Sequence, residues 1–208
     1  MTTLRENFPI KLKQGEDCEQ ELLAILLQLY PMAKKMEGNH KAFDFLIPEL
    51  DMRLELKFDV MARDTNNWAI EVMCMGKPSG LLTTEAQIWI QAHEDAFYFM
   101  NTGRLRTFLK KQRDLGKFKL VKGGDDLASE LVLIWRERLN REDWIHKHKR
   151  NDPYVSMAAL RGFIERFYIP KPVIHSQQVK GLTVSNNCDI VYSDKQDVLI
   201  EPPRLDGR

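Results

Sequence analysis

Two short stretches that alternate between charged and apolar residues constrain the fold of this chain most strongly. In RLELKFDV, which begins at Arg53, and in FDFLI, which begins at Phe43, an apolar side chain recurs at every second position. Successive side chains of a strand point to opposite faces of a sheet, so a period of two predicts strands. The intervening PELDM is short and turn-like. The two stretches therefore predict an antiparallel hairpin.

The same alternation predicts which charged side chains lie together. Glu55 and Lys57 share one face of the second strand, and Asp44 can lie on that face across the hairpin. Two neighbouring carboxylates repel each other without a cation, whereas their oxygens are suitable ligands for a hard divalent cation. The pattern is therefore compatible with a metal-binding edge. Ion-paired surface charges on an amphipathic strand are the open alternative.

The remaining periodic segments predict an α/β fold. A helix is expected over residues 15–30, with the apolar stripe Cys18, Leu22, Ile25, Leu26 and Leu29. After the hairpin come the strand NWAIEVM, the helix TTEAQIWIQAH, the strand DAFYFM and the helix TGRLRTFLKKQRDL. This order, helix, three-strand meander, helix, strand, predicts a mixed β-sheet flanked by helices.

The C-terminal part of the chain is less regular. FKLVK and ELVLIWRERL predict strands, VSMAALRGFIERF predicts a helix, and NCDIVY and DVLIEPP suggest extended structure. We expect a core domain over residues 1–150 and a C-terminal extension over residues 151–208 that packs on the core. About 58 residues with few apolar anchors would make a weak independent domain.

Composition excludes several classes of protein. With 43% hydrophobic and 29% charged residues, the 208-residue chain is of the globular type. No apolar run approaches the roughly 18 residues that span a bilayer, so no membrane partner is expected. The start MTTLRENF lacks the apolar block of a signal peptide, which predicts a cytoplasmic protein. The three cysteines have no zinc-type spacing, so reduced thiols are expected.

The net charge is only +1, but the positive charges are concentrated in one basic segment. Between Arg104 and Lys122 there are eight lysines or arginines and a single acid, Asp114. This segment predicts phosphate contacts, with a solvated helix face as the alternative. The loop MGKPSGLL and the start of the predicted helix TTEAQIWIQAH, which follows it, can also contact phosphate. The alternative is that these residues serve only as a turn and a helix cap. The candidate DNA-binding residues are Lys77, Ser79, Thr83, Thr84, Arg104, Arg106, Lys110, Lys111 and Arg113.

An acid on one strand followed by E-x-K on the next resembles the PD-(D/E)-x-K nuclease superfamily. Asp44, Glu55 and Lys57 match that pattern, with Leu56 in the variable position and Phe43 where a proline often stands. GEDCEQEL is similar to the G-x-x-x-E-x-E-L helix of archaeal-type Holliday junction resolvases, and it places Glu19 at their helical active-site glutamate. NNWAIEV and GKPSGLLTTEAQIWI are similar to segments of phage-encoded nucleases of the superfamily. The resemblance covers roughly residues 12–115.

The resemblance implies a restriction-endonuclease-like fold and a metal-dependent DNA endonuclease, which could be selective for junctions or branched DNA. Asp44, Glu55 and the Leu56 carbonyl would bind Mg²⁺, with Mn²⁺ expected to substitute. Lys57 would orient the attacking water or stabilise developing charge, and Glu19 would hold a second metal or a metal-bound water. Symmetric cutting of two strands would suit a homodimer. The alternatives are a catalytically silent DNA-binding module and a structural protein of a viral or larger assembly.

Overall fold

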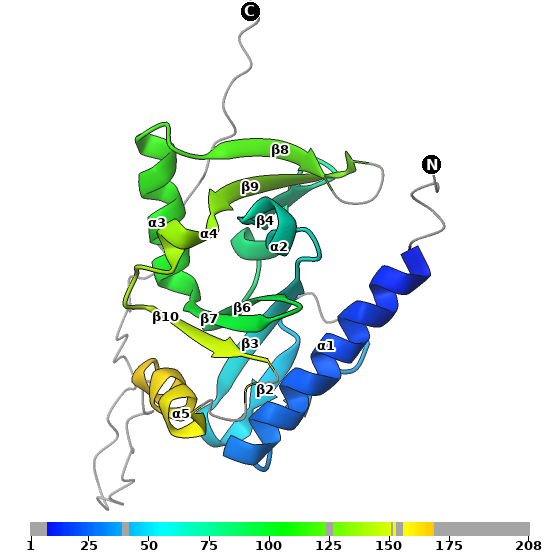
Figure 1. Ribbon diagram of the computed structural model, residues 1–208, viewed down its shortest axis with the longest axis vertical. Helices are drawn as coiled ribbons and strands as arrows, with labels where there is room; N and C mark the ends of the chain where they lie inside the picture. The colour runs from blue at the N-terminus through cyan, green and yellow to red at the C-terminus, as the bar shows by residue number, and fades with distance from the viewer. Residues whose placement is uncertain (1–7, 39–41, 124–126, 151, 153–155, 169–208) are drawn as a thin grey trace, which may run out of the picture. The chain divides into compact units, whose positions relative to one another are not determined.

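The computed structural model describes residues 8–38, 42–123, 127–150, 152 and 156–168, all within the unit Met1–Ile169. The predicted segments NCDIVY and DVLIEPP lie outside the described residues. The described part contains two β-sheets flanked by helices (Figure 1). The predicted α/β class and the mixed sheet are therefore confirmed.

The larger sheet has six strands of mixed direction. Across the sheet these are β1 (Lys34–Lys35), β2 (Phe45–Ile47), β3 (Met52–Phe58), β6 (Ile88–His93), β7 (Ala96–Asn101) and β10 (Ile145–Lys149). β2 and β3 form the predicted antiparallel hairpin, with Phe45 opposite Leu54. On its other side β3 runs parallel to β6, with Leu56 opposite Ile90. β3 is thus an inner strand of the sheet.

The smaller sheet has four antiparallel strands. In order they are β5 (Lys77–Pro78), β4 (Asn67–Cys74), β9 (Ser129–Trp135) and β8 (Lys119–Gly123). The helices are α1 (Phe8–Leu29), α2 (Ala62–Thr65), α3 (Thr102–Asp114), α4 (Arg136–Leu139) and α5 (Met157–Arg166). Two 3₁₀ turns, η1 (Pro48–Leu50) and η2 (Gly80–Leu82), precede β3 and β6.

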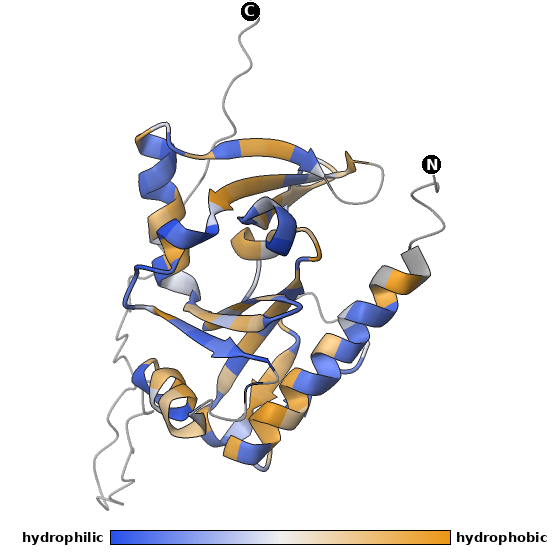
Figure 2. Cartoon of the chain, viewed as in Figure 1, coloured by the Kyte–Doolittle hydropathy of each residue, from blue (hydrophilic) through white to orange (hydrophobic). Residues whose placement is uncertain are grey.

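Two clusters of buried apolar side chains cover the two faces of the larger sheet. The first combines the predicted stripe of α1, including Leu22, with Leu54 of β3, Ile90 of β6 and Phe163 of α5. Figure 2 shows the hydrophobic residues of α1 recurring between hydrophilic ones, as expected for an amphipathic helix. The second cluster is built from apolar residues of β6, β7, α3 and the smaller sheet, among them Trp89, Tyr98, Leu105, Trp68 and Ile134.

The segment NWAIEVM forms β4 as predicted, but its partners were predicted wrongly. β4 pairs with β5 and β9 in the smaller sheet, and the position beside β3 is taken by β6. The antiparallel meander of the larger sheet is instead formed by β1, β2 and β3. The alternation of Trp68 and Ile70, both buried, reports a strand with one apolar face and does not specify the neighbouring strand.

The predicted helix TTEAQIWIQAH is also wrong, because its second half is the strand β6. Ile88 and Ile90 of β6 belong to the first core cluster, and Trp89 belongs to the second. A strand that is buried on both faces has apolar residues at successive positions, so its sequence lacks the alternation that identifies a half-buried strand.

α1 begins earlier than the predicted start at residue 15. The helix includes seven further residues from Phe8 onward, so Glu16 and Asp17 lie within it, away from the first turn. Pro9 lies in that first turn, where the missing N–H has no helical partner. The acids of GEDCEQEL therefore gain nothing from the N-terminal end of the helix dipole.

Gly80, the first residue of η2, allows a close approach between this turn and β4. Its φ is +51°, and a Cβ at this position would lie 2.5 Å from the carbonyl oxygen of Glu71. We expect Gly80→Ala to lower the free energy of unfolding by roughly 3 kcal/mol or more, because backbone atoms must move.

Gly76, with φ +74° and open space around it, is the matched control for Gly80→Ala. Gly76→Ala should cost about 1–2 kcal/mol from strain alone. Equal losses in urea denaturation would contradict the close-approach explanation.

Candidate active site

Asp44 and Glu55 lie close together at the end of the β2–β3 hairpin. Phe45 pairs with Leu54 in antiparallel register, and the Asp44 N–H donates to the Leu54 carbonyl at 2.9 Å. Asp44 thus comes directly before this pair and Glu55 directly after it, and the two carboxylates are near enough for the Asp44 charge to raise the pKa of Glu55. The Leu56 N–H donates to Asp44 Oδ2 at 2.8 Å, so the carboxylate reaches toward β3.

The Glu55 carboxylate is buried, and each of its oxygens has a contact. Lys57 Nζ lies 2.6 Å from Glu55 Oε1, and the Thr84 hydroxyl lies 3.4 Å from Glu55 Oε2. Burial raises the pKa of Glu55, and the Asp44 carboxylate raises it further, while Lys57 opposes both effects. The structure therefore brings Asp44, Glu55 and Lys57 together, as the strand pattern predicts.

Burial likewise raises the pKa of Asp44, with Lys57 and the Leu56 N–H acting in the opposite direction. For Lys57, burial lowers the pKa, but the Glu55 and Asp44 carboxylates outweigh it and the net shift is upward. Lys57 is therefore protonated at neutral pH. Two carboxylates that are costly to ionise beside a single fixed ammonium form a site that an added cation would stabilise.

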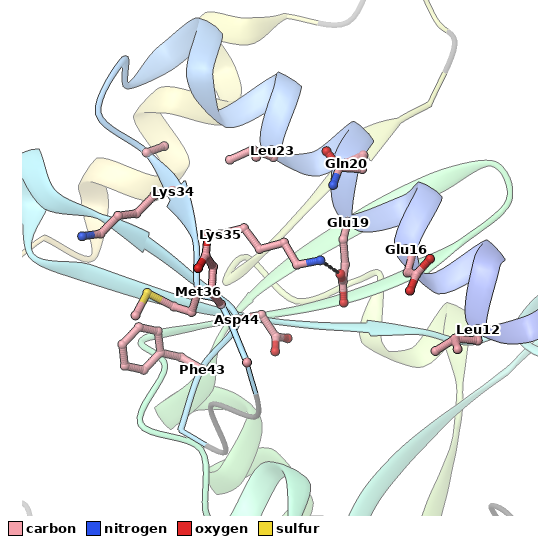
Figure 3. Close-up of a pocket in the computed structure, with 13 residues that line it drawn as sticks. Leu12, Glu16, Glu19, Gln20, Leu23, Lys34, Lys35, Met36, Phe43 and Asp44 are labelled. Atoms are coloured by element: carbon pink, nitrogen blue, oxygen red, sulfur yellow. Dashed lines mark ion pairs between the residues drawn. The ribbon is translucent and has the colours of Figure 1, made fainter.

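Glu19 projects from α1 toward the same end of the hairpin. It shares the lining of a cavity of about 720 Å³ with Asp44, Glu16, Lys34 and Lys35 (Figure 3). Its charge contributes to the raised pKa of Asp44. Glu19 forms an ion pair with Lys35 of β1. Sequence reasoning missed Lys35, because β1 has only two residues and no alternation that would reveal it.

The Leu56 carbonyl has the direction needed for a ligand beside these acids. The N–H and C=O of one strand residue point to the same side, and the Leu56 N–H points toward Asp44. β2 begins at Phe45, so this carbonyl lies beyond the β2 pairing. Two carboxylates and a carbonyl are oxygen ligands of the kind that Mg²⁺ accepts, with waters completing its shell. Among the described residues, no group of three or more His, Cys, Asp or Glu side chains could hold a metal ion.

Two further acids have structural partners. Glu71 accepts hydrogen bonds from the hydroxyls of Ser79, at 2.6 Å, and Ser129, at 2.8 Å. Its carboxylate contributes to the raised pKa of Lys57. Asp59 is half-buried, and its carboxylate accepts the N–H groups of Met61 and Ala69, both at 3.0 Å.

The residues predicted to contact DNA differ in how free they are to do so. Arg104, Lys110 and Lys111 are exposed on α3, and Lys77 and Thr83 are exposed before β6. Arg113 pairs with Asp114 at 3.1 Å, and the Ser79 hydroxyl is engaged by Glu71. Arg106 is half-buried, and its guanidinium donates to the carbonyls of Leu81 and Thr84. An i, i+4 pattern places Arg106 on a side of the helix but cannot indicate that this side faces a loop.

Comparison with protein-family models, with curated proteins and with solved structures found no match to this chain. None of the helices in the described ranges is both long and apolar enough to span a membrane. The functional argument therefore rests on the residues of the site and their geometry.

Proposed function

We propose that this protein is a Mg²⁺-dependent DNA endonuclease that hydrolyses phosphodiester bonds. The observation that carries the proposal is the closeness of the Asp44 and Glu55 carboxylates, with protonated Lys57 in contact with Glu55 at 2.6 Å. Both acids have raised pKa values that a bound cation would reverse. Glu19, facing the same end of the hairpin, supplies a further carboxylate.

Each residue has a role that its surroundings support. Asp44, Glu55 and the Leu56 carbonyl would hold the cation. When bound, Mg²⁺ would polarise the scissile phosphate and lower the pKa of the attacking water. Lys57 keeps its proton, so it would donate a hydrogen bond to that water or to the developing negative charge, and it would not act as a base. Glu19 would orient a water or hold a second cation.

The order of elements also supports the restriction-endonuclease-like fold that the resemblance implies. α1 is followed by the antiparallel meander of β1, β2 and β3, and the chain then returns to the sheet as β6, parallel to β3. The candidate acids lie on the first helix, directly before the second strand and on the third strand of this order. The expected crossover helix is replaced by α2, β4, β5 and η2.

Cleavage assays with purified protein test the proposal. Supercoiled plasmid, linear duplex, single-stranded DNA and a four-way junction would be incubated with Mg²⁺, with Mn²⁺ or with EDTA. We expect metal-dependent cleavage, lost in Asp44→Asn and retained in Asp17→Asn, which neutralises an exposed acid of α1. Preference for the junction or for branched DNA would define the substrate class. Metal-independent binding without cleavage would favour the silent DNA-binding module, and neither binding nor cleavage would favour an interaction protein.

The exposed basic face of α3 makes a separate prediction. Changing Arg104, Lys110 and Lys111 together to glutamate should weaken DNA binding regardless of sequence, because phosphate contacts release counterions. The slope of log affinity against log salt should flatten by roughly one for each lost contact. Thr107→Ala would control for helix substitution on the same exposed face without changing its charge. Fluorescence anisotropy over a salt series measures both quantities, and an unchanged slope in the triple variant would show that this face is only solvated.

A further inference from the structure

The Thr84 side chain is buried, and its hydroxyl contacts Glu55 of β3 and Ala42, two residues before Asp44. Its hydroxyl oxygen lies 3.0 Å from the Ala42 carbonyl and 3.4 Å from Glu55 Oε2, and it accepts the Ala86 N–H at 3.2 Å. A hydroxyl has one proton, so Thr84 donates to only one of the two acceptors at a time. The Ala42 carbonyl also accepts the Glu85 N–H at 2.8 Å, and it therefore keeps a donor when Thr84 donates to Glu55.

The segment that contains Thr84 is held by an arginine from α3. Arg106 Nε donates to the Leu81 carbonyl at 2.9 Å, and Arg106 Nη2 donates to the Thr84 carbonyl at 2.7 Å. One planar guanidinium thus holds both ends of residues 81–84. A lysine could not reproduce this geometry, because its ammonium is a single point of donation.

The two carboxylate oxygens of Glu55 therefore contact residues at different distances along the chain. Oε1 contacts Lys57, two residues along the same strand, whereas Oε2 contacts Thr84, 29 residues away in the chain. Lys57 alone leaves the carboxylate free to rotate about one contact. A second contact, from a segment clamped by Arg106, restricts that rotation.

We infer that Thr84 and Arg106 are positioning residues, which set the orientation of the Glu55 carboxylate for a divalent cation. Arg106 holds residues 81–84 in place, and this fixes the position of the Thr84 hydroxyl. The contact of that hydroxyl with Glu55 Oε2 in turn fixes the orientation of the Glu55 carboxylate. This inference rests on the proposed function and adds two residues to its site. It also reassigns Arg106 from phosphate contact to support of the acid pair.

Cation binding tests the role of Thr84 independently of cleavage. Mn²⁺ binding would be measured by electron paramagnetic resonance, with Mg²⁺ as competitor, for the wild-type protein, Thr84→Val and Thr84→Ser. Loss of a group that orients a ligand typically costs about 10–100-fold in metal affinity, so we expect that loss in Thr84→Val and near-normal affinity in Thr84→Ser. Thr65→Val is the matched control, since the Thr65 hydroxyl donates to the Met61 carbonyl at 2.8 Å.

Arg106→Lys tests the clamp with a variant that keeps the charge. We expect weaker Mn²⁺ binding, in the same direction as Thr84→Val, with DNA affinity and its salt dependence in EDTA unchanged. The double variant should bind Mn²⁺ no more weakly than the worse single variant, because both changes act on one contact. If Arg106 contacts phosphate instead, the salt slope will flatten by about one and Mn²⁺ binding will stay normal, which overturns the reassignment.

The outcomes separate this inference from the proposed function. A wild-type protein that binds neither Mn²⁺ nor Mg²⁺ contradicts the proposed function itself. A wild-type protein that binds Mn²⁺, with equal binding by Thr84→Val, overturns only the role of Thr84. Weak binding by Thr84→Ser as well as by Thr84→Val would show that the hydroxyl is not the determinant. If Thr84→Val fails to fold, judged by circular dichroism, Thr84→Ser and Arg106→Lys still decide the matter.

Discussion

Replacing Lys57 by alanine is expected to slow Mg²⁺-dependent DNA cleavage by about 10²–10³-fold, with DNA affinity near that of the wild-type protein. The protonated amine lies beside both acids, where negative charge would develop during phosphodiester hydrolysis. An interaction that strengthens mainly in the transition state affects the rate more than binding. Single-turnover rates at saturating Mg²⁺ would measure the effect. A modest loss of Mg²⁺ affinity is also expected, because the two carboxylates lose the charge that offsets their repulsion.

The ion pair of Lys122 and Glu130 supplies the control for this result. It joins adjacent strands of the smaller sheet at 2.6 Å, the same separation as that of Lys57 and Glu55. Lys122→Ala should leave the rate unchanged. Glu55→Ala should lose cation binding together with cleavage. Full activity of Lys57→Ala would refute its assigned role, and full activity of Glu55→Ala as well would place the active site elsewhere.

The second large effect is expected for a substitution of Asp44, which should remove activity and increase stability. Asp44→Asn should abolish cleavage and raise the free energy of unfolding of the metal-free protein by roughly 1 kcal/mol, within the usual range for stabilising substitutions. Burial disfavours the charged form of Asp44, whereas a neutral amide oxygen can still accept the Leu56 N–H. Mg²⁺ should stabilise the wild-type protein and not the variant, because a ligand stabilises only the state that binds it.

The pH dependence of that stabilisation follows from the raised pKa of Asp44. The folded protein retains the Asp44 proton at pH values where the unfolded chain has already released it. The free energy of unfolding therefore falls as the pH rises through the interval between the unfolded and folded pKa values. The advantage of Asp44→Asn should be absent below the unfolded pKa, about 4, and complete above the folded value. Urea denaturation across pH would measure it, with Asp17→Asn as the exposed control. An advantage that shrinks as pH rises would contradict this account.

Local patterns were sufficient to predict the acid pair. The alternation around Glu55 and the short connection PELDM specify both the hairpin and the face that carries the charges, because both depend on residues close in sequence. The apolar stripe of α1 and the basic helix α3 were predictable for the same reason, since a period of 3.6 depends only on neighbouring turns.

The surroundings of the acid pair could not be predicted, because they come from distant segments. Nothing in the sequence around Glu19 indicates its ion pair with Lys35, and nothing in α3 indicates that Arg106 faces two carbonyls. β6 has apolar residues on both faces, so its sequence does not alternate between apolar and polar residues. The sequence therefore gave no basis for identifying β6 as a strand or for placing it beside β3. Thr84, which lies just before β6, was therefore predicted to be a helix cap or phosphate contact, and its approach to Glu55 was missed.

The parallel pairing of β3 with β6 has a consequence for the order in which the site is assembled during folding. The acid pair is closed by a short hairpin, but the contact of Thr84 with Glu55 closes 29 residues of chain, and the contact of Ser129 with Glu71 closes 58. Closing a longer loop costs more entropy, and contacts between distant residues form more slowly. We therefore expect the two carboxylates to meet before their orientation is set. A partly folded chain would hold them without Thr84, and the docking of β6 on β3 would be the step that confers competence to bind a cation.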